Sequence, residues 1–149
     1  MIEKFLAFSA EVTAFTVFEL RGTGQAEAYL AAVVGVVGKE LLGQLLDAYD
    51  RVPAEPKERD SLLRREIFGD EKLGPIARNV IKLWYIGIWY ELPRGWTEAF
   101  GALDKDVTFM VSASAYTEGL LWTAAGANPS GAKAPGYASW VGPPQIRQV

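Results

Sequence analysis

The 149-residue sequence contains no cysteine and no histidine. Without cysteine, the chain cannot form a disulfide, present a thiolate nucleophile, or hold zinc or an iron–sulfur cluster through thiolates. Without histidine, it lacks the side chain that most often serves as a general base or a transition-metal ligand. Ser-His-Asp and Cys-His catalysis are therefore excluded, and we predict no catalytic and no metal-binding residues in this chain.

An excess of basic residues and a long apolar run are also missing. Fifteen lysines and arginines stand against 18 aspartates and glutamates, whereas nucleic-acid binders usually carry a basic surplus or stripe. The most apolar helical stretch, 28–38, has about half of the roughly 20 residues that span a bilayer. The opening residues MIEKFL lack the basic and apolar regions of a signal peptide. We expect no nucleic-acid partner, no direct membrane span and no visible signal peptide.

Hydrophobic and aromatic residues, in contrast, are plentiful. Half of the residues are hydrophobic, and the chain has five Trp, six Tyr and seven Phe. A chain of this length can form one domain with its own core. Large aromatic side chains fill cores and also anchor protein interfaces, so the composition is compatible with partner binding.

Apolar residues recur every three or four positions over most of the first 125 residues, which predicts helices. We expect them at 3–18, 25–50, about 58–68, 73–90 and 105–125, with a short helical turn at 96–100. Gly35, Gly38 and Gly43 in the second helix favour either the close approach of another backbone or a bend. Asp104 suits the cap of the last helix, and Gly126 suits its end.

The last 23 residues have a composition that fits neither a regular helix nor a central strand. They hold four of the eight prolines and three of the fifteen glycines. Tyr137 and Trp140 are spaced along them, although disordered tails usually lack aromatics. We therefore expect an extended arm laid over a surface of this chain or of another protein. The predicted fold is all-α: a single helical domain of about five helices at 1–126, and an extended C-terminal arm at 127–149.

Two features that could carry chemistry have plainer explanations. Gly22 and Gly24 precede a helix as in a phosphate-binding turn, but Glu27 replaces the third glycine and no strand comes before it. We interpret this segment as a helix–helix turn. Several acidic residues could act as acids or bases, but they lie in charged or capping regions and match no EF-hand pattern. We interpret them as caps and solvated surface: Asp104, Asp106, Glu66, Asp70 and Glu71.

Aromatic residues at helical spacing around 84–90 fit either core packing or a partly exposed interface. Lys133, in the glycine-rich arm, is either a solvated lysine or a salt-bridge donor to a partner. We predict that partner binding draws on these residues, some of whose rings must instead belong to the core: Trp84, Tyr85, Trp89, Tyr116, Trp122, Lys133, Pro135, Tyr137 and Trp140.

Several segments, taken in order, carry a resemblance to one family. They are FLAFSAEVTAF at 5–15, GTG at 22–24 leading into AYL at 28–30, LGPIARNVIKLWYIG at 73–87, YTEGLLW at 116–122, and GANPSGAKAPGYASW at 126–140. From about residue 5 to residue 144, the chain resembles the small (gamma) subunit of bacterial membrane-bound FAD-dependent sugar and polyol dehydrogenases. Members of that family serve D-sorbitol, fructose and glucose dehydrogenases.

The resemblance implies an accessory subunit that is not an enzyme by itself and carries no cofactor. Its partner would be the large FAD-bearing subunit, and a haem c subunit would be an indirect partner that passes electrons to quinone. The complex would lie at the periplasmic face of the bacterial inner membrane. Small subunits of the family typically carry a twin-arginine signal, and none precedes Phe5 here.

Two other functions stay open at this point. One is a cytoplasmic export or assembly chaperone for a secreted oxidoreductase, which would dissociate after maturation. The other is a small enzyme that uses Tyr, Lys or carboxylates, which a buried polar pocket with shifted pKa values would favour.

Overall fold

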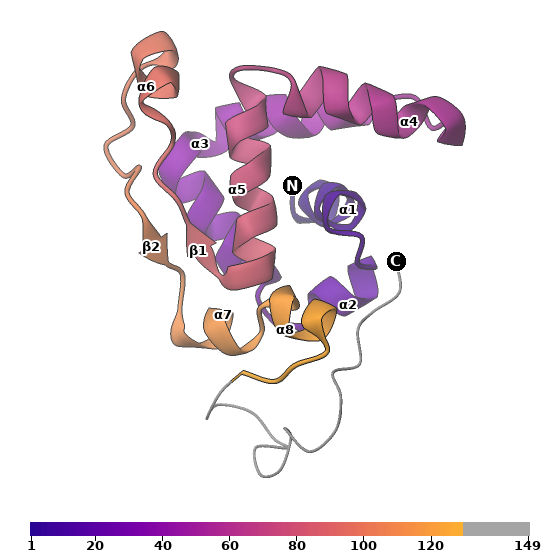
Figure 1. The fold of residues 1–149 in the computed structure, drawn as a ribbon. Coiled ribbons are helices and arrows are strands. Elements are labelled where there is room, and N and C mark those ends of the chain that lie inside the picture. Colours follow the sequence, from indigo (N-terminus) through magenta and orange to yellow (C-terminus); the bar gives the residue numbers. More distant parts are fainter. Residues whose placement is uncertain (130–149) are drawn as a thin grey trace.

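Helices account for most of residues 1–129, the part of the chain that this computed structural model describes (Figure 1). The α-helices are α1 (Ile2–Thr13), α2 (Val17–Gly22), α3 (Ala26–Asp50), α4 (Pro56–Leu63), α5 (Leu73–Ile86), α6 (Arg94–Phe100), α7 (Ala113–Thr117) and α8 (Leu120–Ala125), and a π-helix spans Arg64–Phe68. Strands β1 (Ile88–Trp89) and β2 (Phe109–Met110) pair antiparallel. The predicted all-α class is confirmed.

The core lies where α1, α3 and α5 pack against one another (Figure 1). Trp84 on α5 is at its centre: the Phe5 ring stacks on it with centroids 6.3 Å apart, and the Tyr29 ring meets it edge to face at 4.9 Å. All three side chains are completely buried. Aromatic pairs of this geometry add about 0.5–1.5 kcal/mol each beyond the burial of their area, so these contacts join the three helices firmly.

Helix α3 is longer than its most apolar run suggested. Its 25 residues are long and apolar enough to cross a membrane by length and composition, contrary to the expectation from the 28–38 stretch alone. In this structure, however, α3 is bent at Gly38, whose φ of 83° and ψ of 160° are not helical. Tyr29, Val33 and Leu42 on its inner side are fully buried in the core. The core helix of a soluble protein can be equally long and apolar. Of the two alternatives considered for the glycines, the bend is present, at Gly38.

The helix predicted at 3–18 is two helices. Ala14 adopts a left-handed conformation with φ 60° and ends α1. Thr16 then starts α2 through a capping box, in which its hydroxyl accepts a hydrogen bond from the Glu19 amide and the Glu19 carboxylate accepts one from the Thr16 amide. Satisfying these otherwise unpaired amides favours a new helix at this point.

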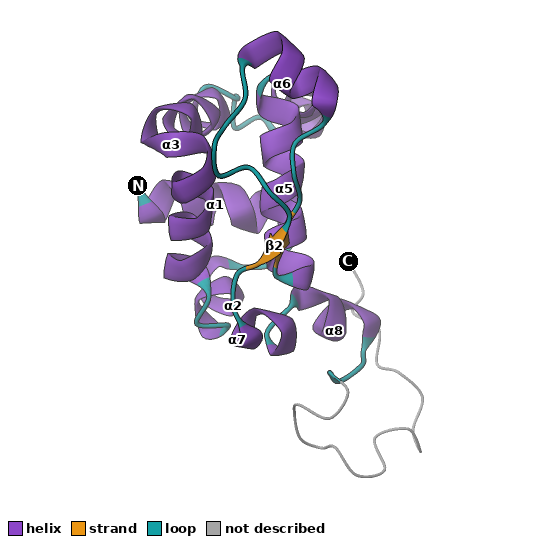
Figure 2. Ribbon diagram, turned by 90° about the vertical axis from the view of Figure 1, so that its left-hand side faces the viewer, coloured by secondary structure: helices purple, strands orange, loops and turns teal. Residues whose placement is uncertain are grey.

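The helices predicted at 73–90 and 105–125 are wrong at the residues that form β1 and β2. Helix α5 ends at Ile86 because Gly87 is left-handed, with φ 71°, and its amide bonds back to the Leu83 carbonyl. Residues 101–108 contain no helix, and α7 and α8 are short. Asp106 was expected to be a helix cap or a solvated surface residue, but it is buried and bonded to Trp89 on β1. Figure 2 shows α6 at one end of the molecule and α7 and α8 at the other, and β1, the strand that pairs with β2, is the one that packs against α5.

Candidate partner-binding surface

Two of the predicted partner-binding residues belong to the core. Trp84 and Trp89 are each 0 % exposed. The Trp89 indole N–H donates a 2.9 Å hydrogen bond to the Asp106 carboxylate, so its polar atom is satisfied within this chain. The core alternative therefore holds for both indoles, and they are removed from the set of surface anchors. Helical spacing places rings on one face but cannot tell whether this chain or another covers that face.

Tyr85 is half-buried and connects α5 to the corner between α1 and α2. Its hydroxyl donates a 2.9 Å hydrogen bond to the Thr13 carbonyl. Its ring meets the Phe15 ring edge to face, with centroids 6.1 Å apart. With both its polar and apolar parts engaged inside the chain, Tyr85 positions the surface around it and presents little area of its own.

Tyr116 and Trp122, which α7 and α8 carry, are brought together at the surface. The Trp122 indole N–H donates a 2.8 Å hydrogen bond to the Tyr116 carbonyl, and the two rings meet edge to face at 5.5 Å. Tyr116 is 36 % exposed, and Trp122 is half-buried. The hydrogen bond to the backbone carbonyl restrains the indole, so the two rings form a fixed aromatic pair in which the Tyr116 ring is exposed.

Close packing against α5 positions these two short helices. A β-carbon added at Gly87 would lie 2.7 Å from the Ala115 β-carbon, and one added at Gly119 would lie 2.6 Å from the Tyr85 carbonyl oxygen. On the other side, the Ser112 hydroxyl caps α7 through the Ala115 amide, and the Gln25 amide donates to the Ser114 hydroxyl. Glycine is needed at 87 and 119 because a side chain would force the segments apart.

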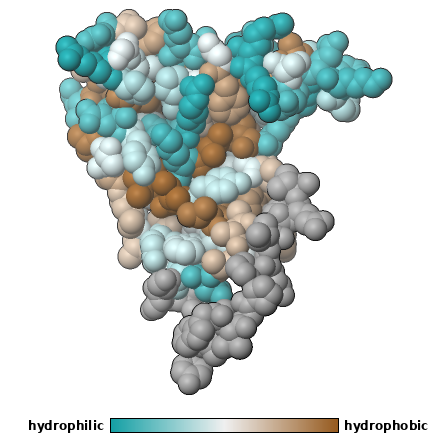
Figure 3. All heavy atoms as spheres, in the orientation of Figure 1, coloured by the Kyte–Doolittle hydropathy of each residue, from teal (hydrophilic) through white to brown (hydrophobic). Residues whose placement is uncertain are grey.

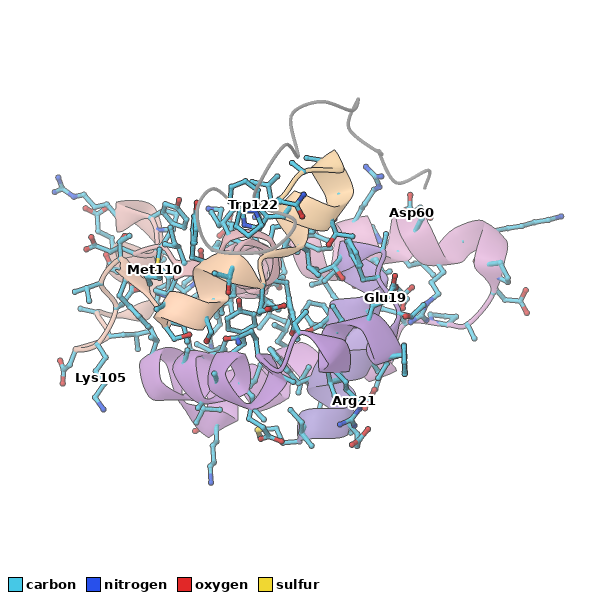
Figure 4. All side chains as sticks on the ribbon, turned by 90° about the horizontal axis from the view of Figure 1, so that it is seen from below. Glu19, Arg21, Asp60, Lys105, Met110 and Trp122 are labelled. Atoms are coloured by element: carbon cyan, nitrogen blue, oxygen red, sulfur yellow. The ribbon has the colours of Figure 1, made fainter. Side chains whose placement is uncertain are left out.

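A groove of about 300 Å³ separates α2 from α7 and α8. Phe15, Glu19 and Thr23 line one side, and Glu118, Leu120 and Trp122 are among the residues on the other. Figure 4 views this end of the molecule and shows Glu19 on α2 and Trp122 on α8. The chain runs into the groove again at Ala127–Pro129, which also contribute to its lining.

Both carboxylates and apolar side chains line the groove. Glu19 and Glu118 supply two carboxylates, and among residues 1–129 no lysine or arginine lines the groove. Burial raises the pKa of the nearby Tyr29 hydroxyl, and the charge of Glu118 raises it further. The Glu118 charge therefore acts on groups in the protein interior as well as on the groove.

Sequence reasoning missed two exposed apolar residues next to this groove. Phe18 is 85 % exposed on α2, and Leu121 is 45 % exposed on α8 between two groove residues. Phe18 shares a helix face with the groove residue Gly22, four positions later. The T-x-x-E pattern at 16–19 could have revealed Phe18, because this pattern marks the start of a new helix. Phe18 then belongs to that helix and not to the apolar stripe of α1.

The face shown in Figure 3 carries an apolar band over β1 and the C-terminal end of α5. Ile86 and Ile88, which are partly exposed, lie in this region. Ile88 pairs with Met110 across the two strands, and Met110 is exposed. Alternation along β1 turns Trp89 inward and leaves Ile88 outward, so Ile88 and Met110 present apolar area at the strands.

The acidic residues considered for catalysis do not come together. Asp70 caps the start of α5 through the amides of Lys72 and Leu73, as interpreted from the sequence. Asp106 is neither a cap nor solvated: it is buried and accepts hydrogen bonds from Trp89 and Leu92. Within residues 1–129, no three acidic side chains gather closely enough to hold a metal ion.

The remaining predicted residues, Lys133, Pro135, Tyr137 and Trp140, lie outside the described residues, as does most of the predicted arm at 127–149. No family model, curated protein or solved structure matches this chain.

Proposed function

We propose that this chain is a non-catalytic small subunit that binds and stabilises the FAD-bearing catalytic subunit of a membrane-bound sugar or polyol dehydrogenase. The observation that carries the proposal is the group of apolar side chains exposed around the groove at one end of the molecule. Tyr116, Leu121 and Phe18 are exposed there, beside the fixed indole of Trp122. In the proposed complex, the chain lies at the periplasmic face of the bacterial inner membrane.

The segments that carry the resemblance converge in space, which supports the proposal. The segment at 5–15 lies in and just after α1, the segment at 22–24 joins α2 to α3, and the segment at 116–122 joins α7 to α8. Helix α5, which holds most of the segment at 73–87, contacts both α1 and α8. Segments far apart in the sequence thus pack against one another around α5.

Burial of apolar area is the mechanism of the proposed binding. A stable interface of standard size removes about 1,600 Å² from water, and a few aromatic anchors in its centre usually supply most of the affinity. Tyr116 and Trp122 suit this role because the hydrogen bond between Trp122 and the Tyr116 carbonyl restricts them before binding. Less conformational entropy is then lost when the partner docks.

The neighbouring reading frames are first searched for an FAD-dependent dehydrogenase, and co-expression with that flavoprotein then tests the proposal. We expect the tagged chain to co-purify with that flavoprotein in a stable one-to-one complex and to raise its thermal stability. Tyr116→Ala and Trp122→Ala should each weaken the complex by about 1–3 kcal/mol, the usual effect of truncating an interface anchor. Phe100→Ala is the matched control, since Phe100 is also exposed but lies on α6, away from the groove.

Three results would contradict the proposal. The neighbouring reading frames could encode no FAD-dependent dehydrogenase, or the flavoprotein could be equally stable and recovered alone. A transient association that ends once the flavoprotein has matured would instead indicate an assembly chaperone.

A further inference from the structure

Strand β2 is paired with β1 along one edge only. The Val111 amide donates a 3.0 Å hydrogen bond to the Gly87 carbonyl just before β1, and Phe109 is aligned with its partner on β1. In an antiparallel pair, the backbone N–H and C=O groups of alternate residues point to the same side of the strand. The groups of Phe109 and Val111 therefore face β1, and those of Thr108 and Met110 face the opposite edge.

This second edge of β2 is open among residues 1–129. No backbone hydrogen bond from another described segment reaches Thr108 or Met110 there, and Figure 2 faces this edge and shows no helix or strand in front of β2. An open edge is a template for a further strand, and proteins usually protect it with a charge or a proline. The segment VTFMV at 107–111 contains neither.

The order of side chains in this segment suits pairing with a second copy of itself. It has Val107 and Val111 at equal distances on either side of Phe109. In antiparallel pairing about a two-fold axis at Phe109, Thr108 of each copy lies opposite Met110 of the other, and the two exchange their outward-facing backbone hydrogen bonds. The segment therefore reads as the same pattern from either direction.

The same register covers apolar side chains that this chain leaves open. Val107, which is 56 % exposed, lies opposite Val111 of the second copy, and the two half-buried Phe109 rings meet at the axis. Cross-strand pairs of aromatic and β-branched residues stabilise a sheet, whereas like charges directly opposite destabilise it. The charged residues at 104–106 fall opposite uncharged residues at 112–114, so no like charges oppose the pairing.

We propose that the open edge of β2 is a self-association site, along which two copies of this chain pair antiparallel about a two-fold axis at Phe109. The strand order across the dimer is β1–β2–β2–β1, and four strands against helices are more stable than two short ones. An edge this short buries less than the roughly 1,200 Å² of a stable interface, so the dimer is weak and forms as the concentration rises. The described lining of the groove includes no residue of 107–111, so the two surfaces can be tested separately.

Sedimentation equilibrium of the purified full-length chain, from about 10 μM to about 500 μM, tests the proposal. We expect a reversible monomer–dimer equilibrium. Met110→Pro removes the outward N–H, which an edge strand tolerates because that group makes no bond to β1. Met110→Ala is the matched control, since it loses the side chain and keeps the N–H. The dimer dissociation constant of Met110→Pro should exceed that of Met110→Ala about tenfold or more.

Single cysteines test the register, because the native chain has no cysteine and a disulfide can then form only between copies. Phe109→Cys places the two sulfurs at the axis, at a non-hydrogen-bonded position where opposite β-carbons are close enough for a disulfide. Val107→Cys is the control: it is exposed, but its two copies lie four residues apart along the strands, about 13 Å. Under mild oxidation, Phe109→Cys should form dimers about tenfold faster or more.

Three results would overturn the proposal: a wild-type chain that stays monomeric over the whole concentration range, a dimer equally strong in Met110→Pro and Met110→Ala, or equal rates of disulfide formation in Val107→Cys and Phe109→Cys. Far-UV circular dichroism checks that each variant is folded, and the wild-type measurement needs no variant. No flavoprotein is present in these experiments, so their failure leaves the proposed complex unaffected.

Discussion

Gly119 lies directly against the carbonyl oxygen of Tyr85: a β-carbon at Gly119 would be only 2.6 Å from that oxygen. Gly119 caps the start of α8, and Tyr85 belongs to the last turn of α5. This contact therefore sets how closely α8 packs on the core helix. Because the opposing atom belongs to the backbone, it cannot move aside as the end of a flexible side chain could.

Gly119→Ala is expected to lower the free energy of unfolding by about 1–3 kcal/mol, the usual effect of overpacking. Urea denaturation followed by far-UV circular dichroism measures the change. Gly95→Ala is the control, because a β-carbon there meets nothing within 4 Å and Gly95 lies inside α6. That variant should gain up to about 1 kcal/mol from improved helix propensity. Equal stabilities for the two variants would contradict the close contact.

Asp106→Ala is expected to destabilise the fold by about 2–3 kcal/mol, because it leaves the buried Trp89 indole N–H and Leu92 amide without their acceptor. Near-UV circular dichroism should also change as the Trp89 ring loses its fixed setting. Asp104→Ala, on an exposed neighbour, should change stability by less than about 0.5 kcal/mol. A silent Asp106→Ala variant would show that the loop at 101–108 does not depend on this carboxylate.

Glu11 should make stability depend on pH in the acidic range. Arg59 donates two hydrogen bonds to its carboxylate, of 2.5 and 2.6 Å, and Tyr49 donates a third. Chiefly because of the Arg59 hydrogen bonds, the folded-state pKa of Glu11 is lowered below its ordinary value of 4.5. The stabilisation is therefore fully present above the unfolded-state pKa and is lost as the pH falls through the lower folded-state value.

We expect wild type and Glu11→Gln to differ by on the order of 1 kcal/mol near neutral pH, since the pair is partly exposed. The difference should shrink as the pH is lowered from about 5 toward 3. Denaturant titrations at several pH values measure it, and a constant difference across this range would contradict the assignment. The same environment raises the pKa of Tyr49 to about 12, first through burial and then through Glu11.

Trp84 and Tyr116 should separate folding from binding. Trp84→Ala is expected to lose about 3–5 kcal/mol of stability, as large-to-small changes of a buried Trp do. Tyr116→Ala should change the stability of the isolated chain by less than about 1 kcal/mol, because its ring is exposed. Its effect should appear in the complex with the flavoprotein, measured by co-purification or calorimetry. A strong loss of folding in Tyr116→Ala would place this ring in the core instead.

Local patterns predicted the helices well where apolar spacing and end signals within one segment are sufficient. The stripe that includes Phe5 and Phe8 marks α1, the apolar residues of 25–50 mark α3, and Gly126 ends α8 in a left-handed conformation as expected. The same patterns failed at 87–90 and 105–112. There, pairing of β1 with β2 and the buried carboxylate of Asp106 depend on residues about 20 positions apart, and periodicity within one segment carries no information about such contacts.

The sequence by itself determined that this chain has no imidazole and no thiol chemistry, because composition requires no structure, and that its helices carry apolar faces, because residue spacing does. Only the tertiary structure decided which rings those faces bury. Trp84 packs against rings on α1 and α3, and Trp89 bonds Asp106 in the loop before β2, whereas Tyr116 on α7 stays exposed. The physical reason is that an apolar residue has the same preference for burial at either place, and what covers it depends on segments distant in sequence.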